Sequence, residues 1–125
     1  MDRLEALQAE LRQFAAERDW DRFHDPKNLA MAVASEAGEL LAVLRWVHSD
    51  EADAACREPG RRAALAEEIA DVAITLLMLC ERTGIDLIEA VRRKIEANRA
   101  RYPVPLARGR PDRPRREPAQ AHAVA

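Results

Sequence analysis

Aromatic side chains are scarce in this 125-residue chain, and their scarcity limits what can fill its core. They make up only 4% of the residues, so a core must be built mainly from Ala, Leu, Val and Ile. With so few aromatics, their positions along the chain are informative. The five are Phe14, Trp20, Phe23, Trp46 and Tyr102.

Long hydrophobic runs and cysteines are also lacking. The longest apolar stretch, residues 72–80, is far shorter than the ~20 residues that span a bilayer. The N-terminus has no apolar signal core. Cys56 and Cys80 match neither a metal-ligand nor a disulfide-framework spacing. We therefore expect a cytoplasmic protein with free thiols and no membrane partner.

A large excess of one charge is missing as well. Twenty basic and 22 acidic side chains give a net charge of -2, which excludes a generic nucleic-acid binder held by a basic field. Residues 103–125 differ from the rest because they hold five of the seven prolines and five arginines. The composition predicts one folded domain over residues 1–102 and a disordered, solvated tail over 103–125. A tail that contacts a partner is the alternative.

Residues 1–102 are predicted to be all-α, because apolar residues recur at helical spacing and no stretch alternates as a strand does. Asp25 followed by Pro26 is typical of a helix start, and Gly84 is typical of a helix end. Residues 49–60 are interpreted as a connection. The four expected helices contain Leu4 to Phe14, run from Pro26 to about Trp46 or His48, run from about Arg61 to Arg82, and run from about Asp86 to before Pro103.

Acidic residues interrupt the apolar faces of the second and third predicted helices. Each helix carries two carboxylates, three residues apart, beside its apolar stripe. The two pairs are 32 residues apart in the sequence. The pairs are Glu36 with Glu39, and Glu68 with Asp71.

Four clustered carboxylates are unfavourable in a folded protein unless a cation compensates their charge. Oxygen ligands without Cys or His suit a hard ion, so we expect Mg²⁺, with Mn²⁺ or Ca²⁺ as substitutes. A di-iron site is disfavoured because it needs Glu-x-x-His, and neither pair has a histidine at the fourth position. The alternatives are solvated helix faces or structural ion pairs with arginines.

The fourth predicted helix and the tryptophans add a second set of candidates. Lys94, Asn98 and Arg101 share one helix face and precede Tyr102, as donors to a polyphosphate would. Trp46 and the group of Trp20, Phe23 and His24 contain rings that can stack on a nucleobase. An ordinary solvated helix face and core tryptophans are the alternatives.

Several motifs together resemble the MazG-like all-α nucleotide pyrophosphohydrolases, and within them most of all the dCTP pyrophosphatase group. The likeness covers about residues 4–108. The motifs are FAAERDWDRFHDPKNLAMAVASEAGELL, RWV, EEIADV and KIEANRARYP. Any one of them alone would be weak, whereas the combination is specific.

The resemblance implies an all-α four-helix MazG-like bundle, completed by homo-oligomerisation, that hydrolyses a deoxynucleoside triphosphate to monophosphate and pyrophosphate. It implies a homotetramer, a dimer of dimers with sites at subunit interfaces, and favours dCTP or a modified dCTP. The implied roles are Mg²⁺ binding and catalysis by Glu36, Glu39, Glu68 and Asp71; phosphate binding by Lys94 and Asn98 with Arg101 and Tyr102 nearby; and base binding by Trp20, His24 and Trp46.

The third predicted helix independently favours an oligomer, because Ala73, Ile74 and Leu77 leave it little polar face. A body of about 100 residues cannot easily bury such a helix alone, so partner subunits are expected to cover it. Two other functions remain open at this point. One is a pyrophosphohydrolase of broader or different nucleotide specificity, and the other is a non-catalytic helical oligomerisation or regulatory module.

Overall fold

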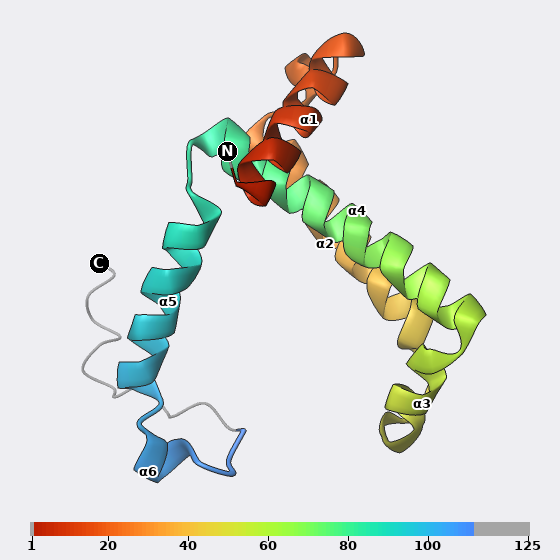
Figure 1. Cartoon of the computed structure of the whole chain (residues 1–125), viewed down its shortest axis with the longest axis vertical. Coiled ribbons are helices and arrows are strands. Elements are labelled where there is room, and N and C mark those ends of the chain that lie inside the picture. The colour runs from red at the N-terminus through yellow and green to blue at the C-terminus, as the bar shows by residue number, and fades with distance from the viewer. Residues whose placement is uncertain (1, 112–125) are drawn as a thin grey trace. The chain divides into compact units, whose positions relative to one another are not determined.

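The computed structural model describes residues 2–111, and within them every regular element is a helix. The all-α prediction is confirmed, and its four helices correspond to the four long ones, α1, α2, α4 and α5 (Figure 1). The α-helices are α1 (Arg3–Glu17), α2 (Pro26–Leu44), α3 (Ala52–Arg57), α4 (Pro59–Thr83), α5 (Leu87–Arg101) and α6 (Val104–Ala107), and two 3₁₀ turns are η1 (Asp21–Phe23) and η2 (Ser49–Glu51).

Residues 49–60 connect α2 to α4 as predicted, but the stretch contains η2 and α3, and α4 already begins at Pro59. Apolar periodicity does not predict α3, because its residues are mostly small or polar. A helix of two turns also contains hardly one repeat of the helical apolar pattern. The short helix α3 packs against the beginning of α4.

The described residues form two compact units, one that ends at residue 86 and one that begins at residue 87. In the first unit α2 and α4 lie side by side along most of their length, and α1 packs against α4 (Figure 1). The ion pair between Arg12 and Glu81, 2.8 Å between Nη1 and Oε1, joins α1 to the last turns of α4. These contacts place the middle of α2 beside the middle of α4, where both acidic pairs lie.

The ends of α2 and α4 are fixed by local chemistry. The Asp25 carboxylate accepts a hydrogen bond from the backbone N–H of Asn28 at 2.9 Å, which satisfies one free donor at the start of α2. The last turn of α2 is held by α4, because Arg61 Nη1 donates to the Val43 carbonyl at 2.8 Å. Gly84 ends α4 with φ 69°, a left-handed conformation that glycine adopts without strain. The predicted start of α2 and the predicted end of α4 are confirmed.

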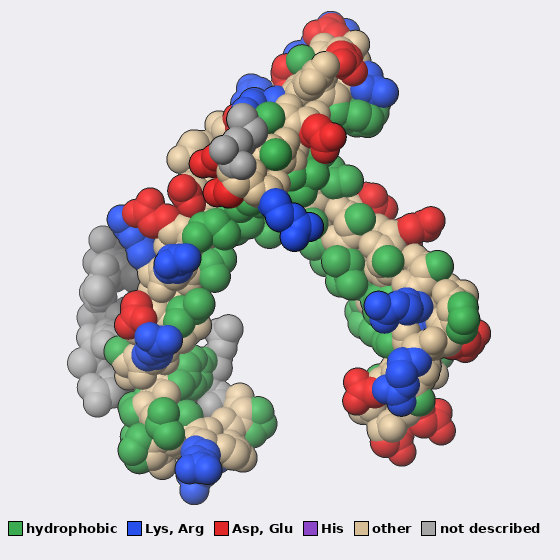
Figure 2. All heavy atoms as spheres, viewed as in Figure 1, with side chains coloured by type: hydrophobic (Ala, Val, Ile, Leu, Met, Phe, Trp, Pro, Cys, Tyr) green, Lys and Arg blue, Asp and Glu red, His purple; other side chains and the backbone are tan. Residues whose placement is uncertain are grey.

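The core of this chain is small for its length. Only four of the described residues are buried apolar side chains: Ala15, Leu29, Leu77 and Cys80. Leu77 is covered by α1 of the same chain, whereas Ile69 and Ile74 on the same helix stay exposed. Figure 2 shows hydrophobic side chains gathered at the surface over α2 and α4. The first unit therefore keeps much of its apolar surface open.

The second unit consists of α5 and α6. Along α5, Ile88, Val91 and Ile95 form one exposed apolar face. The predicted tail begins with α6, a single turn of helix, and its residues 112–125 lie outside the described part of the chain. Within the described residues, no helix combines the length and the apolar character that crossing a membrane requires.

Candidate functional site

Three of the four predicted metal ligands meet where α2 lies against α4. Glu36 of α2 and Glu68 and Asp71 of α4 each offer one carboxylate oxygen, and these oxygens lie within 4.8 Å of one another. Glu36 and Glu68 are partly buried and Asp71 is exposed, so the group opens to solvent on one side. Two helices, each with ligands on the face toward the other, thus bring together residues that are 32 and 35 positions apart.

The charges of this group act on each other. The pKa of Glu68 is raised above its ordinary value, first by partial burial and then by the negative charges of Asp71, Glu39, Glu36 and Glu67. Glu39 is therefore electrostatically close, although its oxygens are not within the three-residue group. Glu67 was missed by the sequence analysis, because only residues beside the apolar stripe were considered. A surplus of negative charge surrounds Glu68.

The structural ion-pair interpretation finds no support in the first unit. Among its described residues, three Arg side chains pair with acids outside the cluster, and none pairs with the carboxylates of the cluster; the pairs are Arg12–Glu81, Arg18–Glu17 and Arg22–Asp19. Three adjacent oxygen ligands without a cationic neighbour fit a hard divalent ion such as Mg²⁺. The donor set contains no sulfur or nitrogen that would favour a softer metal.

The predicted base-binding residues lie at opposite ends of α2. Trp20 and His24 flank η1 just before α2, and Trp46 follows its last turn with 86% of its surface exposed. Because α2 has 19 residues, these two groups are separated by roughly 28 Å along the helix axis. The carboxylate group lies about midway between them. A single chain does not bring Trp46 together with Trp20 and His24.

The aromatic residues near η1 do form a group with α1. The Trp20 ring packs edge-on against Phe14 with centroids 5.6 Å apart, and against His24 at 6.5 Å. The Arg18 guanidinium lies 3.8 Å from the centroid of the Phe14 ring. Next to this group, a cavity of about 70 Å³ lies between α1, η1 and α4, and its walls include Leu11, Ala15, His24, Leu77, Met78 and Arg82.

The predicted phosphate-binding residues belong to the second unit. Lys94, Asn98 and Arg101 share one face of α5, and Asn98 and Arg101 are partly buried. The Asn98 carbonyl accepts a hydrogen bond from the Tyr102 backbone at 2.7 Å. The Arg101 guanidinium lies 5.8 Å from the Tyr102 ring centroid. This unit therefore presents a cationic and amide-bearing face of its own.

Comparison with known proteins identifies the family. The sequence profile of the MazG-like family matches residues 31–111, more than half of the chain, including every carboxylate of the cluster and the basic face of α5. The chain belongs to the MazG-like family. The predicted resemblance is thereby confirmed at the level of the family.

Individual curated proteins are also similar over most of the chain. It is 46% identical to dCTP pyrophosphatase 1 of Bos taurus over 97 residues, which are 78% of this chain and 57% of the relative. It is 47% identical to dCTP pyrophosphatase 1 of Homo sapiens over 96 residues, 77% of this chain and 56% of the relative. The chain thus spans little more than half the length of these curated relatives.

A solved structure matches the fold more completely. A pyrophosphatase from Archaeoglobus fulgidus superposes with a TM-score of 0.78 at 42% sequence identity. The match covers 82% of this chain and 94% of the archaeal one. The helical body of the present chain therefore corresponds to nearly the whole of that structure.

Proposed function

We propose that this MazG-like protein hydrolyses a deoxynucleoside triphosphate to its monophosphate and pyrophosphate, with dCTP or a modified dCTP as the favoured substrate. The observation that carries the proposal is the group of Glu36, Glu68 and Asp71 oxygens within 4.8 Å at the contact of α2 and α4. The relatives named dCTP pyrophosphatase 1 and the archaeal structure named a pyrophosphatase support the reaction class. Clearing unwanted deoxynucleotides is the role we assign to it.

The carboxylate group is proposed to hold Mg²⁺, with Mn²⁺ as a substitute. Glu36, Glu68 and Asp71 supply ligand oxygens, and Glu39 adds negative charge or a further ligand. When bound, the ion neutralises triphosphate charge and makes the attacking water more acidic. The pKa of Glu68 is raised first by burial and then by the neighbouring carboxylates, and the negative charge of those carboxylates also attracts a cation.

The remaining predicted site residues receive substrate roles in this proposal. Lys94, Asn98 and Arg101, with Tyr102 adjacent, bind the phosphate chain from one face of α5 and stabilise charge on the departing pyrophosphate. Trp20 and His24 bind the base by stacking and hydrogen bonding, and the exposed Trp46 supplies a second ring.

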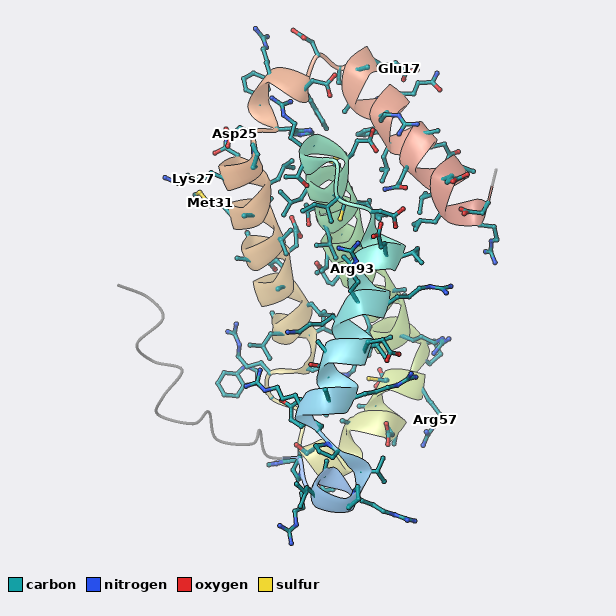
Figure 3. The ribbon with its side chains drawn as sticks, turned by 90° about the vertical axis from the view of Figure 1, so that its left-hand side faces the viewer. Glu17, Asp25, Lys27, Met31, Arg57 and Arg93 are labelled. Atoms are coloured by element: carbon teal, nitrogen blue, oxygen red, sulfur yellow. The ribbon has the colours of Figure 1, made fainter. Side chains whose placement is uncertain are left out.

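The separation of the aromatic residues supports an oligomer. Trp46 lies roughly 28 Å from the other base-binding candidates along α2, so a base held by both would need residues from two chains. On the outer side of α2, Met31 is 60% and Leu41 61% exposed, and Figure 3 shows Met31 and Lys27 directed away from α4. We propose that further copies of the chain cover this side of α2, as a dimer of dimers.

The test is pyrophosphate release from a panel of canonical and modified nucleotides with Mg²⁺. We expect dCTP or a 5-substituted dCTP to react fastest. Glu68→Gln and Asp71→Asn should each lower kcat/KM by at least a hundredfold, because each removes a ligand charge while keeping the side-chain shape. Glu58→Gln, at the start of the same helix, is the control and should retain wild-type turnover.

The results separate the open alternatives. Turnover of dUTP or a purine nucleotide in place of dCTP would keep the chemistry and change the specificity, giving a broader house-cleaning pyrophosphohydrolase. Full activity of Glu68→Gln or Asp71→Asn would refute the metal-cluster assignment. No activity on any nucleotide, together with no thermal shift on adding Mg²⁺ and nucleotide, would favour the non-catalytic oligomerisation module.

A further inference from the structure

The turn that carries Trp20 and His24 is held by hydrogen bonds to its backbone. Inside η1, the Phe23 N–H donates to the Trp20 carbonyl at 2.8 Å, and the His24 N–H donates to the Asp21 carbonyl at 3.1 Å. Two such bonds leave a short 3₁₀ turn weakly determined by itself. Its orientation must be set by contacts with the surrounding helices. From α1, the Ala15 carbonyl accepts a hydrogen bond from the Trp20 N–H at 3.0 Å, and the Phe14 ring packs against Trp20.

Two side chains from the other helices donate hydrogen bonds to carbonyls of the turn. From α4, Arg82 Nη1 donates to the Asp21 carbonyl at 3.0 Å, across 61 positions of sequence. From α2, Asn28 Nδ2 donates to the Phe23 carbonyl at 3.1 Å. The Asp21 carbonyl thus accepts both the His24 N–H and the charged Arg82 donor, and hydrogen bonds from a charged donor are the stronger kind.

We propose that Arg82 is a positioning residue for base binding: by holding the Asp21 carbonyl it fixes the orientation of the Trp20 and His24 rings toward the nucleobase. The inference rests on the proposed function, since it assumes that these rings bind the base. Arg82 itself is assigned no contact with substrate. Its neighbour contact, the Arg12–Glu81 ion pair, joins α1 to α4 without contacting the backbone of the turn.

The chain offers a matched set of variants for this inference. Arg82→Met removes the guanidinium and keeps most of the apolar stem, whereas Arg82→Lys keeps a charged donor. Arg12→Met removes the other arginine contact between the N-terminal region and the end of α4. If Arg82 acted only by general packing, the two methionine variants would behave alike.

The first measurement is hydrogen exchange of the turn in the full chain. Arg82→Met should raise the hydrogen-exchange rates of the Phe23 and His24 amides by roughly tenfold, because the Asp21 carbonyl then no longer accepts the hydrogen bond from Arg82. The exchange rates of these amides in Arg82→Lys should lie between those of wild type and Arg82→Met. Arg12→Met should leave these two amides unchanged.

The second measurement is steady-state pyrophosphate release. Arg82→Met should raise KM for dCTP roughly tenfold with kcat within about twofold, because the base lies away from the reacting phosphorus and contributes binding. In the same variant, the difference in kcat/KM between pyrimidine and purine triphosphates should become smaller. Arg82→Lys should restore part of both losses, and Arg12→Met should keep the wild-type base preference.

Each other outcome refutes a defined statement. If wild type is active and Arg82→Met has the same KM and the same base preference, the inference is overturned, even if hydrogen exchange of the turn increases. Equal effects of Arg12→Met and Arg82→Met on KM overturn it as well, since they indicate general packing. A wild-type protein that neither hydrolyses nor binds any nucleotide overturns the proposed function, and the inference with it.

Discussion

Leu77 is a buried apolar residue on the side of α4 that faces α1, and shortening it should loosen the packing of the two helices. Leu77 is 5% exposed and Ala15 on α1 is 3% exposed, and both line the cavity of about 70 Å³ between the two helices. Leu77→Ala removes buried carbon atoms next to space that is already empty, so the two voids merge. We expect the free energy of unfolding to fall by about 2–5 kcal/mol.

The prediction is measured by urea titration at fixed protein concentration, because association with other copies would add to the apparent stability. Leu77→Met is the matched control, since it nearly conserves side-chain volume and should cost less than about 1.5 kcal/mol. A loss below about 1 kcal/mol in Leu77→Ala, or one no larger than that of Leu77→Met, would refute the assignment of Leu77 to the packing of α1 and α4.

The same substitution links packing to the candidate site. Phe14 on α1 packs against Trp20 at 5.6 Å between ring centroids, so a loosened α1 leaves that ring less constrained. The turn at residues 20–24 then depends more on the hydrogen bonds that Arg82 and Asn28 donate to its carbonyls. We therefore expect Leu77→Ala to weaken nucleotide binding more than it lowers kcat.

Two further predictions concern charge and helix ends. The raised pKa of Glu68 means that the folded chain holds this proton more tightly than the unfolded chain, so metal-free stability should decline as pH rises through and above the ordinary glutamate range near ~4.3. Thermal scans from pH 4 to 8 should show a decline of Tm in metal-free wild type and a smaller decline in Glu68→Gln. Mg²⁺ should raise Tm only in wild type. A steeper decline of Tm in Glu68→Gln would contradict the expected direction of the pH dependence. Asp25→Ala should lower the free energy of unfolding by about 1 kcal/mol through loss of the bond to the Asn28 N–H, with Asp25→Ser nearly neutral, and an unchanged urea midpoint would show that this cap contributes nothing.

The long helices and the candidate ligands were accessible from the sequence because they depend on local rules. Helical periodicity, the Asp25–Pro26 start and the Gly84 end act within a few residues, so α2 and α4 were predicted nearly to their ends. The acidic pairs stood out because charge beside an apolar stripe is unfavourable without compensation. The family resemblance followed from motifs that are contiguous in the chain, and the profile match confirms it.

The tertiary structure determined which of the candidate residues lie close to one another. Packing of α2 on α4 brings the Glu36, Glu68 and Asp71 oxygens within 4.8 Å and leaves Glu39 outside that group, a distinction that spacing along each helix does not contain. It also showed that Glu67 contributes to the field at Glu68 and that Trp46 lies at the far end of α2 from Trp20. Helix periodicity fixes the face of a residue, but distances between helices depend on how side chains from remote segments pack, and only the folded chain specifies them.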